Sequence, residues 1–341
     1  MSDEIVFYTT DPHANVAEGA EIRQLLAQCD LDFEESIGQF VLGRHGRSLV
    51  ACAGLDGNIV KCVATAPGYR GESLSLKLMS EVIHLALECG HLHLFLYTHP
   101  KNVSFFEGCG FYELAEVPGY VSLMENTPVG IKGYCGRLQK KREPGAKIGC
   151  IVMNANPFTL GHQYLVRLAA SQCDWLHLFV VREDVSRFSY RDRFALVQSG
   201  VADIPGLTLH HGSEYMVSRA TFPDYFFKEK GIVGDCCTAI DLLLFREYIA
   251  PALGITHRFV GTEPFCATTR KYNNDMKHWL QAADSDAVPV TVVEVPRTAC
   301  AGVPISASEV RRLLRAGDMA HVESLVPRNT LNYLTHNDYV T

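Results

Sequence analysis

The sequence predicts an α/β protein whose C-terminal part builds a parallel sheet with crossover helices, preceded by a smaller α+β part. Two observations support this fold class. From about residue 148, short apolar runs alternate with helix-like segments, which is the pattern of parallel strands joined by helices. Before about residue 128, apolar runs are separated by Gly-containing turns, which is typical of antiparallel strands joined by hairpins.

The C-terminal elements follow from the lengths and the periods of the apolar segments. Short apolar runs have the length of buried strands, and segments with apolar residues three and four apart are amphipathic helices. The expected strands cover 148–153, 176–181, 257–261 and 290–295. The expected helices cover 162–172, 190–200, 238–250 and 306–316.

The N-terminal part should contain strands within 40–67, followed by a helix and a further strand over 91–99. The helix is indicated by apolar residues at steps of three and four from Leu74 to Cys89, and Gly90 supplies its C-terminal stop. Residues 129–147 are Gly-rich and basic without an apolar period, so they are the best candidate for a linker. The expected division is therefore 1–130, a linker over 131–147, and 148–341.

Composition agrees with two globular domains and restricts the partners. The 341 residues are 47% hydrophobic and 20% charged, enough for two cores at about 150 residues per domain. A net charge of −7 argues against nucleic acid and against an anionic membrane surface as partners, because both need clustered Lys and Arg.

The start of the sequence and its cysteines favour a cytoplasmic protein. "MSDEIVFYTT" lacks a basic segment followed by an apolar one, and no apolar run approaches the roughly 20 residues that span a bilayer. The 12 cysteines are scattered without a CxxC pair, which favours reduced thiols in the core, and no metal site is predicted.

The stretch 148–165, "IGCIVMNANPFTLGHQYL", places polar residues where a strand turns into a helix. Ligands of open parallel sheets bind beyond the carboxyl ends of the strands, where helix N-termini offer unpaired N–H groups. Gly161 lets the backbone approach a ligand, Thr159 offers a hydroxyl, and His162 can donate to a phosphate oxygen. The competing interpretation is structural, with Thr159 as an N-cap and His162 as an exposed residue of the first turn.

A second stretch, "VPISASEVRRLLRAG", carries a similar pattern near the end of the chain. Ser306 and Glu309 form an S-x-x-E capping box, which needs no ligand, and Gly317 ends the helix. Ser306, Ser308 and Arg311 would also present two hydroxyls and a guanidinium at a helix N-terminus, which suits a polyphosphate.

Together the two stretches resemble the motifs of the HxGH nucleotidyltransferase superfamily. Thr159-Leu160-Gly161-His162 matches the H/T-x-G-H motif after the first strand, with Thr in place of His as in phosphopantetheine adenylyltransferases. Ile305 to Arg311 matches the later ISxSxxR/K motif in the expected order. The resemblance implies a Rossmann-like domain that catalyses attack on the α-phosphate of a nucleoside triphosphate, with release of pyrophosphate.

Nearly the full chain resembles the citrate lyase ligases. The likeness is carried by "NANPFTLGHQYLV", "VVREDVSRFSYRDRFALV", "FVGTEPFCATTRKYN" and "PISASEVRRLL". It implies an enzyme that activates acetate with ATP and Mg²⁺ as acetyl-adenylate. The acetyl group would then pass to the thiol of the phosphoribosyl-dephospho-coenzyme A group on the acyl carrier (gamma) subunit of citrate lyase.

The resemblance also implies roles for individual residues. His162 and Arg311 would stabilise charge on the phosphates, with Mg²⁺ bridging oxygens. Ser306 and Ser308 would hold the pyrophosphate end, and Glu263 would contact the nucleoside. The full set of candidate ATP contacts is Asn156, Pro157, Phe158, Thr159, Gly161, His162, Gly261, Thr262, Glu263, Ser306, Ser308 and Arg311. Candidate phosphate or acetate contacts, alternatively solvated charges, are Arg182, Arg187, Arg193 and Lys271.

The N-terminal part resembles the GNAT acetyltransferases. Residues 70–75, Arg-Gly-Glu-Ser-Leu-Ser, correspond to a pyrophosphate-binding turn of the form R-x-x-G-x-G/A, with Ser in place of both later glycines. The domain would bind coenzyme A or dock the prosthetic group, and a structural or partner-binding role stays open. The candidate docking residues are Arg70, Gly71, Ser73, Ser75 and Asn102.

Two other functions remain open at this stage. One is a simple adenylyltransferase acting on phosphopantetheine or nicotinamide mononucleotide, which the extra N-terminal domain and the "GTEPF" segment disfavour. The other is a non-enzymatic protein that docks an acyl carrier and keeps the two motifs only as helix caps.

Overall fold

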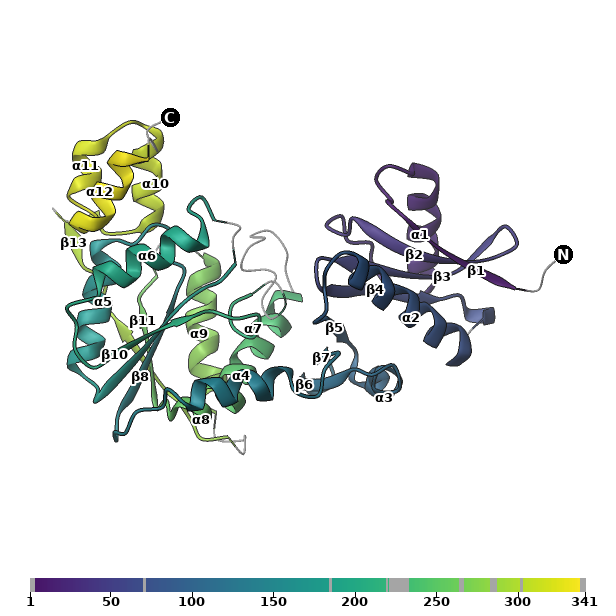
Figure 1. The fold of residues 1–341 in the computed structure, drawn as a ribbon, viewed down its shortest axis with the longest axis horizontal. Helices are drawn as coiled ribbons and strands as arrows, with labels where there is room; N and C mark the ends of the chain where they lie inside the picture. Colours follow the sequence, from purple (N-terminus) through teal and green to yellow (C-terminus); the bar gives the residue numbers. More distant parts are fainter. Residues whose placement is uncertain are drawn as a thin grey trace. The chain divides into compact units, whose positions relative to one another are not determined.

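The computed structural model describes residues 4–69, 72–183, 186–218, 220, 233–263, 267–282, 287–300 and 303–337. By its internal contacts the chain divides into two compact units, 1–130 and 131–341 (Figure 1). Among the described residues, no helix combines the length and the hydropathy that crossing a membrane requires. The nine cysteines with described side chains are unpaired thiols.

The first unit is a seven-stranded sheet between helices, in the order β1-β2-β3-β4-β5-β7-β6. Alternation of apolar residues along the strands gives the sheet two buried faces. On β2, Phe40 and Leu42 pack with helix α1, whereas Val41 packs with helix α2. The strands are β1 (Ile5–Thr10), β2 (Gln39–His45), β3 (Ser48–Asp56), β4 (Ile59–Thr65), β5 (Phe95–Thr98), β6 (Tyr112–Val117) and β7 (Val121–Glu125). The helices are α1 (Val16–Gln28), α2 (Glu72–Glu88) and α3 (Val103–Gly108), with short 3₁₀ turns at Pro67–Tyr69 and Pro100–Asn102.

The second unit is built on a five-stranded, all-parallel sheet in the order β10-β9-β8-β11-β12, with a two-stranded ribbon beside it. The direction of winding reverses between β8 and β11, which makes the gap beyond their carboxyl ends the switch point of a doubly wound fold. The strands are β8 (Ile148–Met153), β9 (Trp175–Val180), β10 (Leu207–His211), β11 (His257–Gly261) and β12 (Thr291–Val295), and the ribbon is β13 (Ala299–Cys300) with β14 (Val303–Pro304).

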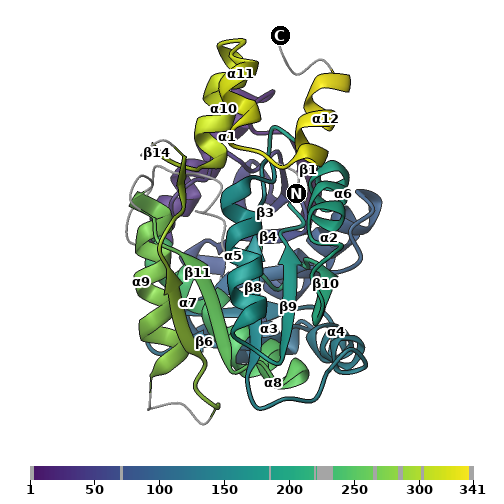
Figure 2. The ribbon, with the colours of Figure 1, turned by 90° about the vertical axis from the view of Figure 1, so that its left-hand side faces the viewer.

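Helices cover both faces of this sheet (Figures 1 and 2). Helix α5 lies along β8, β9 and β11, and its Val166 and Ala169 pack with Ile151 and Leu178 of the strands. Helix α9 packs on β12 and also contacts α7. The helices are α4 (Gly130–Gln139), α5 (Leu160–Ser171), α6 (Tyr190–Gly200), α7 (Val233–Leu244), α8 (Ala250–Leu253), α9 (Ala267–Gln281), α10 (Ala307–Arg315), α11 (Met319–Glu323) and α12 (Arg328–His336), with a π-helical turn over Phe245–Ile249.

The expectation of a parallel sheet with crossover helices is confirmed. The prediction did not include the strand β10 or the helices α9, α11 and α12. The segment of α9 carries many polar residues and few apolar ones, so its helical period is weak in sequence. Its buried residues Tyr272, Met276 and Leu280 recur four apart on the one face that packs on the sheet.

The stretch predicted as a linker begins instead with the helix α4. Its buried side chains are Ile131, Tyr134 and Leu138, and the Tyr134 ring packs 5.6 Å from the ring of Tyr215. These three residues follow a helical period that the surrounding glycines and lysines obscure. The segment therefore contributes to the core of the second unit.

Two neighbouring strands of the second unit carry a pair of buried histidines. His177 of β9 and His210 of β10 are both almost fully buried, and Nδ1 of His177 lies 2.9 Å from Nε2 of His210. Burial lowers the pKa of His177 to about 4, and burial together with His177 lowers the pKa of His210 to about 3. Both rings are therefore uncharged in the folded protein at neutral pH.

This pair should make the protein less stable in mild acid. In the unfolded chain a histidine has a pKa near 6.5, so below that pH the unfolded state binds more protons than the folded state. We expect the free energy of unfolding to fall as the pH drops from about 6.5 towards about 4, by about 2 kcal/mol per histidine at pH 5. Denaturant unfolding at pH 7 and pH 5 measures this loss. A double His177→Asn, His210→Asn variant should lose correspondingly less stability between the two pH values, and an unchanged loss would contradict the assignment.

Candidate functional site

A cavity of about 540 Å³ opens at the switch point of the parallel sheet. Its lining comes from the segment after β8, the first turn of α5, the ends of β11 and β12, and the first turns of α10. These segments are far apart in sequence, as Asn156 and Arg311 are by 155 positions, and they meet because the carboxyl ends of parallel strands share one edge. The cavity therefore lies where the two sequence motifs were expected to bind a ligand.

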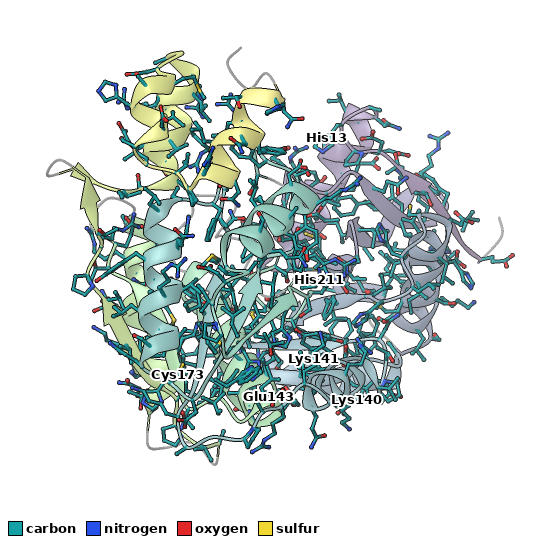
Figure 3. The ribbon with its side chains drawn as sticks, turned by 60° about the vertical axis from the view of Figure 1, so that its left-hand side comes forward. His13, Lys140, Lys141, Glu143, Cys173 and His211 are labelled. Carbon is teal, nitrogen blue, oxygen red and sulfur yellow. The ribbon has the colours of Figure 1, made fainter. Side chains whose placement is uncertain are left out.

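The first turn of α5 presents His162 to this cavity. Thr159 is the N-cap, and its buried hydroxyl accepts a hydrogen bond from the backbone N–H of His162 at 3.3 Å. In return, the imidazole Nδ1 of His162 accepts the backbone N–H of Thr159 at 3.1 Å. The histidine thus takes the place that Glu or Gln has in a usual capping box. In Figure 3, Cys173, just beyond the far end of α5, lies away from α10–α12, so the N-terminus of α5 is directed towards them.

This arrangement determines which nitrogen of His162 carries the proton. A backbone N–H can only donate, so Nδ1 is unprotonated and the hydrogen of the neutral ring is on Nε2. Burial, with a contribution from Arg297, lowers the pKa of His162 to about 4. At neutral pH the ring is therefore an uncharged hydrogen-bond donor on the cavity wall. The ring of Phe158 stacks on it with centroids 5.8 Å apart, which holds its plane.

The N-terminus of α10 faces the same cavity. The hydroxyl of Ser306 caps the helix by accepting the N–H of Glu309 at 3.1 Å. The expected cap is confirmed, but the Glu309 carboxylate bonds Arg312 and not the N-cap backbone. The guanidinium of Arg311 donates to the carbonyl oxygen of Asn156 at 2.5 Å and to the hydroxyl of Ser308 at 3.0 Å.

The starts of α5 and α10 lie close together because position 161 is a glycine. A Cβ atom on Gly161 would come within 3.2 Å of the carbonyl oxygen of Ile305, which is tighter than ordinary van der Waals contact. Two helix N-termini, each the positive end of a helix dipole, are thereby brought to one cavity. Such a pair favours an anionic ligand.

Arg297 is a cavity residue that sequence reasoning missed. It follows β12 by two positions, and its guanidinium donates to the carbonyl oxygen of Thr262 at 2.6 Å and forms an ion pair with Glu263. The backbone N–H of Arg297 also donates to the hydroxyl of Thr262 at 3.2 Å. Its position just beyond the carboxyl end of an expected strand was the signal that could have identified it.

The cavity collects most of the predicted ATP contacts. The predicted residues that line it are Asn156, Thr159, Gly161, His162, Gly261, Glu263, Ser306, Ser308, Arg311 and Arg187. Three others support the lining from behind without contributing to it. Phe158 is fully buried under His162, Thr262 holds Arg297, and Pro157 is buried beside Phe158.

Three basic residues that were candidates for phosphate or acetate contacts lie outside the cavity lining. Arg182 is exposed, and Lys271 is exposed and paired with Asp275 at 2.6 Å. Arg193 is fully buried, contrary to the expectation of a contact or a solvated charge. Its guanidinium donates to the carbonyl oxygens of Phe188, Asn154, Val181 and Glu183 and to the side-chain oxygen of Asn154, over 2.6–3.1 Å. Arg193 therefore holds the ends of β8 and β9 together.

The charges around the cavity favour an anion. The described lining has four arginines (Arg187, Arg297, Arg311 and Arg315) and one carboxylate, Glu263, which is already paired with Arg297. In the described part of the chain, no group of three or more His, Cys, Asp or Glu side chains is placed to hold a metal ion. A divalent ion would therefore enter this cavity with an anionic ligand, because the protein offers it no cluster of oxygen ligands.

The candidate docking residues of the first unit are only partly described. Arg70 and Gly71 lie outside the described residues. Ser75 approaches the end of β4, where its hydroxyl lies 3.4 Å from that of Thr65, and Ser73 and Asn102 are exposed. The parallel pairing of β4 with β5 covers only Ile59–Phe95 and Val60–Leu96, so the two strands are unpaired with each other towards their carboxyl ends.

The doubly wound sheet and the arginine-rich cavity at its switch point define an α/β protein with a pocket whose charges favour an anion. A family model described as "Citrate lyase ligase C-terminal domain" matches residues 148–334, more than half of the chain. The chain belongs to the citrate lyase ligase family.

Similar proteins agree with this assignment over nearly the whole length. The chain is 53% identical over 315 residues to the "[Citrate [pro-3S]-lyase] ligase" of Escherichia coli (strain K12), covering 92% of this chain and 90% of that protein. It is 47% identical to the protein of the same name from Haemophilus influenzae, covering 92% and 94%. A solved acyl-CoA N-acyltransferase from Pseudomonas aeruginosa matches 36% of this chain at 14% identity, with a TM-score of 0.33 that supports no conclusion.

Proposed function

We propose that this chain is an AMP-forming ligase that activates acetate with ATP and acetylates the acyl carrier subunit of citrate lyase. The residues after 148 perform the adenylation, and the residues before 131 dock the prosthetic group of the carrier. The proposal is supported by the family, by the name of its relatives and by the geometry of the pocket.

In the first step, a carboxylate oxygen of acetate attacks the α-phosphorus of ATP. A new P–O bond forms, the bond to the bridging oxygen breaks, and pyrophosphate leaves with its charge, so that acetyl-adenylate remains. No proton is transferred, because the carboxylate is already the nucleophile. Catalysis of this step consists of positioning the reactants and stabilising the developing charge.

The hydrogen bond from the backbone N–H of Thr159 to Nδ1 of His162 is the observation that carries this proposal, because it places the hydrogen of the neutral ring on Nε2. With a pKa of about 4 and its hydrogen on Nε2, the ring cannot serve as a general base while it donates to an oxyanion. This is the donor that a step without proton transfer needs. Arg311 and the N-termini of α5 and α10 surround it with further positive charge, and Ser306 and Ser308 bind the departing pyrophosphate.

Mg²⁺ would accompany ATP and would supply positive charge beside the phosphates. The described residues offer no carboxylate cluster to hold it. Beside the end of β11, Glu263 and Gly261 contact the nucleoside. The ion pair of Glu263 with Arg297 holds this part of the pocket in place.

In the second step, the thiolate of the carrier's phosphoribosyl-dephospho-coenzyme A group attacks the carbonyl carbon of acetyl-adenylate. A C–S bond forms, the C–O bond to AMP breaks, and the thiol proton is lost to solvent. Ser73, Ser75 and Asn102, together with Arg70 and Gly71, bind the arm that delivers this thiol. The product is the acetylated, active carrier of citrate lyase.

Exchange of radiolabelled pyrophosphate into ATP tests the first step. We expect exchange that requires acetate, because acetyl-adenylate formation is reversible on the enzyme. Exchange that instead requires phosphopantetheine or nicotinamide mononucleotide would establish a simple adenylyltransferase. A complete lack of exchange with every acid and acceptor would leave a docking protein whose motifs act only as helix caps.

A further inference from the structure

One corner of the pocket is built around the side chain of Asn154, which no motif includes. Asn154 follows β8, lines the cavity, and accepts a hydrogen bond on its side-chain oxygen from Arg193 at 2.8 Å. Because a guanidinium only donates, this contact fixes which end of the amide is oxygen. The amide nitrogen donates to the hydroxyl of Ser186 at 3.1 Å, and the same hydroxyl lies 3.4 Å from the side-chain oxygen of Asn154.

Ser186 and Arg187 complete this corner. Both line the cavity, and the guanidinium of Arg187 lies 3.5 Å from the carbonyl oxygen of Arg311. Arg311 in turn donates to the carbonyl oxygen of Asn156, two residues beyond Asn154. The corner therefore adjoins Arg311 directly through Arg187, and a second time through the chain segment from Asn154 to Asn156.

We propose that Asn154, Ser186 and Arg187 form the subsite for the carboxylate of the acid substrate. The inference rests on the proposed function and adds the place where the acid binds. An amide N–H, a hydroxyl and one guanidinium match the hydrogen-bonding needs of a single carboxylate. Their single positive charge balances a charge of −1, whereas the triphosphate has the two helix N-termini, Arg311 and Arg315 on its side.

The buried Arg193 is the positioning residue of this subsite. It is not part of the cavity lining, but its bonds to the oxygens of Asn154 and to the carbonyls of Val181 and Glu183 hold the corner in one arrangement. A carboxylate bound beside Arg311 would lie next to the phosphates that Arg311 contacts. This arrangement would bring the nucleophile to the α-phosphate.

The substitution Asn154→Asp tests acetate binding at the subsite while it retains the structure behind the subsite. An aspartate keeps an oxygen for Arg193, so the structure behind it is retained, but it replaces the amide donor by a negative charge. We expect the dissociation constant for acetate to rise about 30-fold or more, and that for ATP to change by less than about threefold. Ser186→Ala should weaken acetate binding by a smaller factor. Asn332→Asp, exposed on α12 and outside the pocket lining, is the control with the same change of charge.

Binding of ¹³C-acetate by NMR and of ATP by calorimetry measures both constants without any turnover. Weaker acetate binding with unchanged ATP binding supports the subsite. If the Asn154→Asp protein loses affinity for ATP and not for acetate, this corner holds phosphate and the inference is wrong. Wild-type protein that does not bind acetate also overturns it. Wild-type protein that binds acetate at this corner but shows no acetate-dependent exchange would keep the subsite and refute the proposed function.

Discussion

Replacing His162 by asparagine should lower acetate-dependent pyrophosphate exchange by roughly 10²- to 10³-fold, the usual loss for one donor to a transition-state oxyanion. The side-chain oxygen of asparagine can take the place of Nδ1 and accept the N–H of Thr159, so the cap of α5 is retained. What is lost is the Nε2–H that reaches into the pocket. Exchange rates and thermal melting of the same preparation check the two parts of this expectation.

Two further variants distinguish a donor from a structural histidine. His162→Gln extends an N–H to about the position of Nε2 and should recover part of the rate. His162→Ala removes the Nε2–H donor and also the Nδ1 atom that accepts the N–H of Thr159. This variant should therefore lose activity and also about 1 kcal/mol of stability. Since the pKa of His162 is about 4, its own titration should not appear in the exchange rate between pH 6 and pH 8. Wild-type rates in the asparagine variant would remove His162 from the mechanism.

Replacing Arg193 by methionine should destabilise the second unit by at least about 3 kcal/mol. The guanidinium donates to four backbone carbonyls and to the side-chain oxygen of Asn154, and methionine can donate to none of them. Methionine fills a similar volume, so the loss arises mainly from hydrogen bonding. Both tryptophans, Trp175 and Trp279, lie in the second unit, and their fluorescence during denaturant unfolding measures its stability.

Arg191→Met is the matched control because Arg191 is exposed on the same helix. Its free energy of unfolding should change by no more than about 0.5 kcal/mol. Arg193→Lys keeps the charge but not the fork of donors, and should lie between methionine and wild type. A loss below about 1 kcal/mol in Arg193→Met would show that the buried network is not what holds the ends of β8 and β9.

The strands and helices that could be predicted are those whose own residues carry a clear pattern. Buried strands such as 148–153 are continuous apolar runs, and the helices 190–200 and 306–316 have both an apolar face and a capping side chain. The helix α9 could not be found in this way, because its packing on the sheet compensates for a polar composition. The helix α4 was not predicted because its glycines and lysines indicate a linker. Burial of Ile131, Tyr134 and Leu138 stabilises the helix in spite of this composition.

The site was predictable where a side chain acts on its own helix. Thr159 and Ser306 are caps, and caps depend on residues no more than three apart. The prediction gave four basic residues one role, but the structure places them in three different environments. Arg187 lines the pocket, Arg193 is buried, and Arg182 and Lys271 are exposed. Burial is a property of the assembled sheet, so residue type and spacing alone did not distinguish them.

By itself, the sequence determined the order of the elements, the two helix N-termini and the family to which they point. These depend on local backbone hydrogen bonds and on apolar periodicity, which neighbouring residues encode. Only the tertiary structure decided that Arg297 joins the pocket, that Arg193 stays behind it, and that Asn154 presents its amide nitrogen. Those outcomes depend on hydrogen bonds between residues 35 to 39 positions apart, such as Arg297 with Thr262 and Arg193 with Asn154, which exist only after the parallel strands have come together.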